Sequence, residues 1–171
     1  TRLDVGGHAP TTYAMSQWSG HLVLGVTNAL GASPVLTLGK YTAYGYGDVD
    51  LAGHDTAVKY INNNESIAAG SSDYSLAKSA TPAALTMNVP SGSAVTAAVK
   101  FDGALDVTFA GSGAYTLINA LSTSTGTLSV SSGTLTFANN AGWGGTNVTV
   151  TGGALILNSA NSIVGKKARR S

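Results

Sequence analysis

The sequence predicts an all-β protein, a single-stranded parallel β-helix (β-solenoid) with coils of about 20 residues. The main observation is a self-repeat, in which residues 126–145 align without a gap on residues 146–165. Each copy holds two short runs of alternating apolar and polar residues, separated by Ser, Thr and Gly, as in two strands joined by a turn. So short a unit cannot bury its apolar side alone, so successive copies must stack.

Composition agrees with this fold class. Gly contributes 22 of the 171 residues and only 10% are charged, against about a quarter in an ordinary globular domain. Thr, Ser and Asn therefore have to keep the chain soluble. No window approaches the ~18 uninterrupted apolar residues of a membrane span, so we expect none. At ~20 residues per coil we expect about eight coils in a rod of roughly 40 Å.

The strands become harder to place towards the N-terminus. Four early runs are legible, at 22–24, 35–38, 49–51 and 58–61, but spacings of about a dozen residues predict longer or three-sided coils there. From residue 85 onward the frame predicts Met87 over Val107 and Val89 over Phe109, Val107 over Leu128 and Phe109 over Val130, and Tyr115 over Leu135 and Leu117 over Phe137. Eight residues of the last two copies are predicted to point inward in two columns: Leu128, Val130, Leu135, Phe137, Val148, Val150, Leu155 and Leu157.

The organisation follows from the repeat. We expect an N-terminal extension or first coil over 1–19, the β-solenoid over 20–165 and a basic tail over 166–171. Residues 1–19 have no apolar leader, so we expect a mature chain or a segment of something larger. With no cysteine an extracellular location is permitted. Nucleic acid is an improbable partner, because net charge is +1 and four of nine basic residues lie in the tail.

The stretch from Gly133 to Ile163, GTLTFANNAGWGGTNVTVTGGALILNSANSI, resembles the autotransporter-associated β-strand repeat. The Asn139-Asn140 turn and the Gly144-Gly145 pair stand where that repeat has them. Residues 20–31 resemble its closing half, and 49–58 resemble the strand that often follows. The resemblance implies a bacterial parallel β-helix of the autotransporter passenger type, secreted or displayed on the cell surface. It implies no activity, because such repeats form a stalk.

One polar and aromatic cluster is a candidate for contact with a ligand or partner. Three tyrosines on a predicted loop could stack on a sugar ring or a protein surface, and nearby acidic groups and a histidine add polar atoms. The members are Tyr41, Tyr44, Tyr46, Asp48, Asp50 and His54. A core or cap role for the tyrosines and a solvated outer strand face for the two aspartates are the structural alternatives. Lys40, Lys59, Lys78 and Lys100 could form a ladder on one face, or serve only as solubilising charges.

The chemistry is sparse. Arginine occurs only at positions 2, 169 and 170, so the rod lacks the guanidinium groups that β-helix enzymes use on acidic sugars. We predict no catalytic residue, metal or cofactor and no enzyme activity. The expected function is that of a structural extracellular segment, whose partners are neighbouring domains of the same precursor. Two alternatives are kept: a self-assembling fibre subunit with head-to-tail contacts, and a carbohydrate-binding or carbohydrate-active β-helix that takes a glycan at the cluster above.

Overall fold

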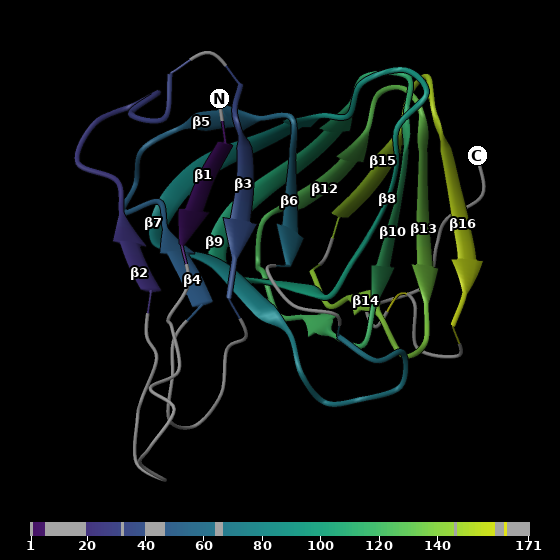
Figure 1. Ribbon diagram of the computed structural model, residues 1–171. Helices are drawn as coiled ribbons and strands as arrows, with labels where there is room; N and C mark the ends of the chain where they lie inside the picture. The colour runs from purple at the N-terminus through teal and green to yellow at the C-terminus, as the bar shows by residue number, and fades with distance from the viewer. Residues whose placement is uncertain are drawn as a thin grey trace, which may run out of the picture.

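The computed structural model describes residues 2–5, 20–31, 33–39, 47–63, 67–145, 147–159 and 163. Within these residues the chain is all-β and coils into a parallel β-solenoid, which confirms the predicted fold class. Every strand pair among them is parallel, and pairs form between successive turns. Figure 1 shows the strands standing side by side, from β1 and β2 at one end to β16 at the other.

The solenoid has three faces, which the chain visits in the same order in each turn. The first face holds β2 (Gly20–Val23), β4 (Gly47–Asp50), the starts of β7 (Ser75–Asn88) and β9 (Val99–Ala110), β11 (Leu121–Ser122) and β14 (Gly142–Trp143). The second holds β5 (Thr56–Val58), the ends of β7 and β9, β12 (Thr127–Val130) and β15 (Asn147–Val150). The third holds β1 (Arg2–Val5), β3 (Val35–Leu38), β6 (Tyr60–Asn63), β8 (Ala94–Ala97), β10 (Ala114–Ile118), β13 (Thr134–Ala138) and β16 (Ala154–Asn158). Five turns carry a strand on all three faces.

Turn length falls along the chain. Leu22 pairs with Val49 and Val49 with Ala77, so the first turns take 27 and 28 residues. Leu128 pairs with Val148, which confirms the 20-residue register of the last two copies. The prediction of longer coils upstream is therefore confirmed. The expected eight coils are wrong, because the early turns use residues for connections as well as for strands.

One predicted alignment is wrong by two residues. Leu85, not Met87, pairs with Val107, and Met87 pairs with Phe109. Because side chains alternate with period two, a shift of two leaves the same residues inside, and the apolar pattern alone could not detect it. The strand partners also slip between Ser79 and Ala83, where β7 bends from the first face to the second.

The interior is a stack of apolar columns. Leu128, Val130, Leu135 and Phe137 are fully buried, as predicted. Aromatic rings share space across turns: Phe101 and Trp143 lie two turns apart, yet their ring centroids are 6.3 Å apart. Buried Ser122 occupies the intervening turn of that face, and its small side chain leaves room for the rings to meet. The Ser122 hydroxyl also accepts a hydrogen bond from the Phe101 N–H at 3.1 Å.

On the third face, side chains bridge a gap in the strand ladder. β6 and β8 lie in different sheets, so the ladder is interrupted between them. Asn63 replaces it: its Oδ1 accepts from the Ala98 N–H at 2.9 Å and its Nδ2 donates to the Ala98 carbonyl at 3.2 Å. Further along, the buried Tyr115 hydroxyl donates to the Ile61 carbonyl at 2.5 Å. Burial raises the pKa of that phenol well above its usual range.

Candidate functional site

The six residues of the predicted contact cluster are only partly brought together. Tyr41, Tyr44 and Tyr46 lie outside the described residues. Asp48 and Asp50 belong to β4, on the first face, and His54 lies in the connection from β4 to β5. The three polar residues therefore follow one another along one turn, and each has different surroundings.

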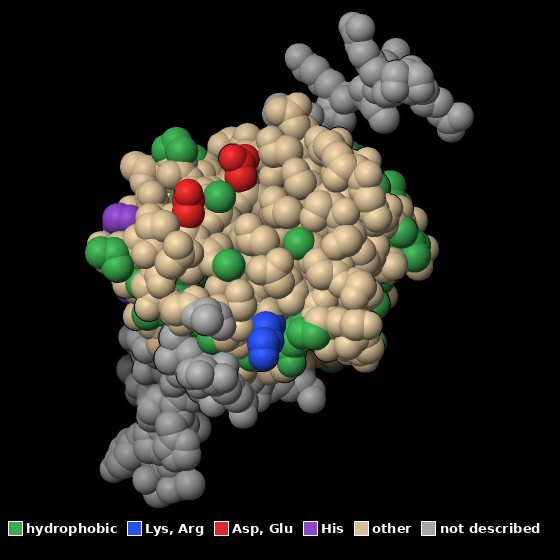
Figure 2. All heavy atoms as spheres, turned by 90° about the horizontal axis from the view of Figure 1, so that it is seen from above, with side chains coloured by type: hydrophobic (Ala, Val, Ile, Leu, Met, Phe, Trp, Pro, Cys, Tyr) green, Lys and Arg blue, Asp and Glu red, His purple; other side chains and the backbone are tan. Residues whose placement is uncertain are grey.

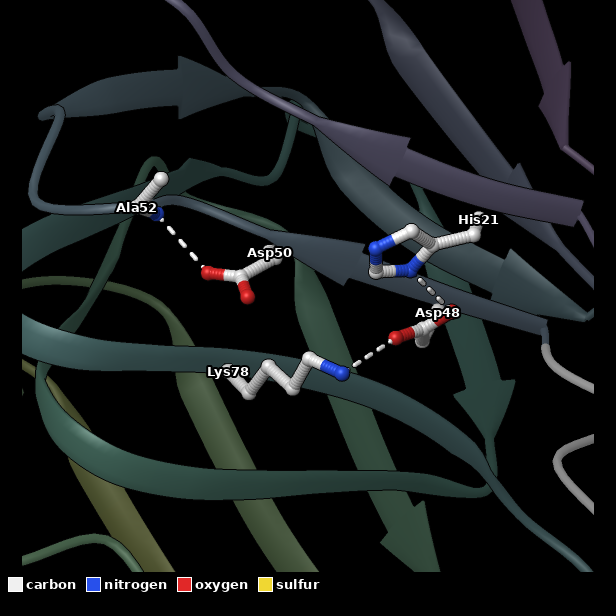
Figure 3. Close-up of polar contacts among 5 residues, drawn as sticks. All are labelled: His21, Asp48, Asp50, Ala52 and Lys78. Carbon is white, nitrogen blue, oxygen red and sulfur yellow. Dashed lines mark hydrogen bonds and ion pairs between the residues drawn. The ribbon is translucent and has the colours of Figure 1, made fainter.

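Asp48 is the centre of a buried polar group on the first face. Its side chain is fully buried, and both carboxylate oxygens are paired. Oδ1 lies 2.8 Å from His21 Nδ1, and Oδ2 lies 2.8 Å from Lys78 Nζ. Figure 3 shows the imidazole of His21 and the ammonium of Lys78 approaching the carboxylate from either side. The expectation of a solvated face is wrong for Asp48.

The three members of this group come from successive turns. His21 on β2 pairs in register with Asp48 on β4, and Lys78 follows on β7. A carboxylate contact at Nδ1 places the imidazole proton on that nitrogen. The His21 and Lys78 side chains are 44% and 31% exposed, so both partners reach water while the carboxylate does not. With one contact to each of the two Asp48 oxygens, the group links the first turns to one another.

Asp50 serves the backbone. Its Oδ1 accepts a hydrogen bond from the Ala52 N–H at 2.8 Å (Figure 3). Ala52 has a φ of 50° and Gly53 one of 83°, so the chain makes a left-handed turn at this point. The carboxylate stabilises that turn in the manner of an Asx turn.

His54 is half-buried, and its backbone N–H donates to the Leu51 carbonyl at 2.8 Å. Its ring makes no contact with the Asp48 group among the hydrogen bonds and ion pairs of the described residues. The described part of the chain contains no group of three or more potential metal ligands. The three described members of the predicted cluster thus have separate surroundings: Asp48 links neighbouring turns, Asp50 stabilises a backbone turn, and His54 lies in a connection.

The lysine ladder is also wrong where the structure describes it. Lys78 pairs in register with Asp102, whereas Lys100 pairs with Leu76, so the two lysines are offset by two residues along the strands. Lys100 Nζ instead lies 5.8 Å from the centre of the Tyr74 ring, a cation–π distance. Lys59 lies between β5 and β6, on another side of the turn. Lys40 falls outside the described residues.

The two ends of the stack carry most of the large exposed apolar side chains of the described residues. Seven large apolar side chains are exposed in the described chain, and six of them belong to the first or last turn. They are Val23 and Val26 at one end, Val150, Ile156, Leu157 and Ile163 at the other, and Leu121 between. Val148 and Leu155 of the last turn are half-buried. The predicted inward columns thus end at an open surface, because no further turn covers them among the described residues.

The sides differ from the ends. On the second face Thr86, Thr108, Ser129 and Thr149 stack in register, so their outer surface is a column of hydroxyl groups. On the third face Thr96, Thr116 and Thr136 form a similar column. Figure 2 shows sparse charged side chains on the side that it presents. Hydroxyl groups therefore replace charge on the outside of the strands, as the composition predicted.

A search of protein-family models, of curated proteins and of solved structures finds no match to this chain. The described residues include no helix with the length and hydropathy needed to cross a membrane.

Proposed function

We propose that this chain is a structural β-solenoid, a stalk or passenger segment of a secreted or surface-displayed bacterial protein. The observation that carries the proposal is the distribution of large exposed apolar side chains: among the described residues nearly all of them lie in the first and last turns of the stack. A segment of this kind extends along one axis, and its strand faces present mainly polar side chains to water. Its buried polar group is used for cross-linking turns.

The repeat supports the extracellular part of the proposal. In the stretch that resembles the autotransporter-associated repeat, β13, β14, β15 and β16 follow one another as strands. Asn139 and Asn140, predicted as the turn, have φ values of 48° and 67°. The fold depends on strand ladders and not on disulfides, since the chain has no cysteine. Such a segment can fold outside the cell without an oxidation step.

Surface labelling tests this proposal. Antibody raised against the folded chain should bind intact source cells or their culture medium, and protease treatment of intact cells should remove the cell-bound signal. A cytosolic protein measured in parallel should stay protected. Signal found only after lysis would contradict the extracellular assignment.

A second function, end-to-end self-assembly, is favoured by the same exposed ends. Val150 and Leu157 are 47% and 48% exposed, although they continue columns whose earlier members are fully buried. Hydrophobic side chains in such positions are stabilised when another turn covers them. We therefore propose as the second function that the chain is a fibre subunit. Growth of the particles with concentration in light scattering would support it, and a constant mass would oppose it.

A further inference from the structure

We infer that Asn147 is an acceptor for N-linked glycosylation, in which the side-chain amide carries a sugar. Asn147 begins β15 and is followed by Val148 and Thr149, so the three residues form the Asn-X-Thr triplet that N-glycosylating enzymes recognise. The inference goes beyond the proposed stalk function and does not depend on it. It adds a modification site on the second face.

Most asparagines of the chain lack the hydroxyl residue that this triplet requires. The sequence holds two triplets of the type, Asn64-Glu65-Ser66 and Asn147-Val148-Thr149, and the first lies outside the described residues. Asn158, on the next strand β16, is exposed as Asn147 is, but Ala160 stands two positions after it. Exposure is therefore common to both asparagines, and the triplet distinguishes Asn147.

The strand directs both recognition groups of the triplet outward. Side chains alternate along a strand, so Asn147 and Thr149 lie on the outer side, whereas Val148 between them packs against the core. Both outer residues are exposed. Two strand positions separate their Cα atoms by roughly 7 Å, so one enzyme can contact the amide and the hydroxyl together.

The outward position is accessible even where turns lie on both sides of it. Asn147 pairs in register with Thr127, and Asp106 occupies the equivalent position one turn earlier. Asp106 has β7 on one side and β12 on the other, yet it is exposed, and its Oδ1 accepts from the Thr127 N–H at 2.6 Å. Access to Asn147 therefore follows from its outward direction and does not require that β15 be the last strand of its face.

The fold does not use the Asn147 amide. None of the hydrogen bonds within the described part of the chain involves this side chain, whereas the amides of Asn63 and Asn119 each hold two segments together. Its outer neighbours Thr127 and Thr149 have small side chains with hydroxyl groups. A sugar on Asn147 thus replaces no contact of the fold and lies on a polar surface.

The reaction needs a sugar that is activated as a phosphate ester. Nδ2 of Asn147 attacks the anomeric carbon, the C–N bond forms, and the C–O bond to the phosphate breaks. The amide nitrogen loses one proton and the phosphate leaves with the bonding electrons. The chain supplies the acceptor, and the enzyme and the activated sugar come from the cell.

Mass spectrometry of the full chain isolated from its source cells and their medium tests the site. We expect a population heavier than the sequence mass by whole sugar residues, with the added mass on Asn147 after fragmentation. N147Q and T149A should lose this added mass, and T149S, which keeps a hydroxyl, should retain it. N158Q is the matched control, because it changes an exposed asparagine outside the triplet, and it should also retain the sugar.

A wild type without a sugar on Asn147 would overturn the inference. A sugar that persists in T149A or disappears in T149S would overturn it as well, because the hydroxyl two positions on would then not be recognised. The outcome is separate from that of surface labelling. Sugar on Asn147 of a chain confined to the cell interior would uphold the inference and contradict the stalk function.

Discussion

Asp48 shows how one carboxylate can link the early turns. A buried carboxylate is costly unless it is paired and hydrogen-bonded, and both oxygens of Asp48 meet cationic or donor groups at 2.8 Å. His21 and Lys78 come from the turns on either side, so separating these turns would expose an unpaired charge. This group adds specificity at the end of the rod where the connections are longest.

Removing one partner should therefore be costly. Lys78→Met leaves Asp48 Oδ2 buried beside an apolar side chain, and we expect a loss of about 3 kcal/mol in the free energy of unfolding. The control is Lys100→Met, a lysine that lies over the Tyr74 ring, for which we expect a loss of about 1 kcal/mol or less. Denaturant melts of both variants provide the measurement. Equal losses would mean that the ion pair does not hold the turns.

Tyr115 gives a second prediction at this scale. Tyr115→Phe leaves the Ile61 carbonyl without the hydroxyl that caps it, and we expect a loss of about 1 to 3 kcal/mol at neutral pH, measured by denaturant melts.

The same residue predicts a dependence on pH. Burial raises the pKa of the folded Tyr115, so its contribution is complete below the unfolded pKa of about 10 and declines as pH rises above it. In alkaline melts the stability of the wild type should fall more steeply above about pH 10 than that of Tyr115→Phe. Parallel slopes would contradict this assignment.

Among the structural elements, the corners between faces impose the strictest demands on residue type. Gly103 lies inside β9, where the strand passes from the first face to the second, and has a φ of 78°. A Cβ at this position would lie 2.1 Å from the Ser79 carbonyl oxygen of the preceding turn. Glycine is needed there both for the backbone angle and for the close approach of two turns.

A pair of glycine substitutions separates these two demands. Gly92 has a φ of 75°, but a Cβ added there would have nothing within 4 Å, so Gly92→Ala should lose only about 1 kcal/mol for the left-handed backbone. Gly103→Ala has the same backbone cost and also a clash, so we expect a loss of more than about 2 kcal/mol. Thermal melts compare the two directly. A Gly103→Ala variant as stable as Gly92→Ala would show that neighbouring turns can separate at that corner.

The inward columns give the next prediction. Leu135→Asp places an unpaired charge among fully buried residues, a cost of several kcal/mol against the roughly 5 to 15 that a domain has. Hydrogen exchange should show loss of protection in β12 to β16. Thr136→Asp, the next residue of β13 and half-buried on the outer surface, is the control and should keep protection. Unchanged melting of Leu135→Asp would mean that the 20-residue register is wrong.

The sequence was sufficient for the last turns and insufficient for the first ones, for a physical reason. In the last turns the connections between strands are short. The 20-residue spacing of the repeat there equals the spacing between paired residues, as between Leu135 and Leu155. Upstream, connections of unequal length separate the strands, and apolar alternation carries no information on their length. The hydrogen bonds that Asn63 and Tyr115 make across the interrupted ladder of the third face could not be predicted either. In the sequence pattern, a tyrosine at an inward position cannot be distinguished from an apolar core residue.

The candidate site could not be predicted from the sequence because nearness in sequence did not produce a common environment. Asp48 and Asp50 are two residues apart on one strand, yet their side chains act differently. Asp48 contacts a residue of the neighbouring solenoid turn, whereas Asp50 accepts a hydrogen bond from the backbone two residues later. The partners of Asp48 lie 27 and 30 positions away, at His21 and Lys78. With turn lengths unknown, no spacing rule could have brought these three together.

At the scale of the whole molecule, sides and ends have opposite character. The sides carry columns of Thr and Ser, and the large apolar side chains that remain exposed among the described residues lie almost entirely on the first and last turns. The proposed stalk and fibre functions both use this property, since each places another turn on an open end.

Negative-stain imaging of the full chain over a series of concentrations tests this account most directly. We predict rods of constant width whose lengths are multiples of one unit and increase with concentration. Particles of one length at every concentration would contradict association through the ends. Growth in width would contradict the expectation that the strand faces do not associate.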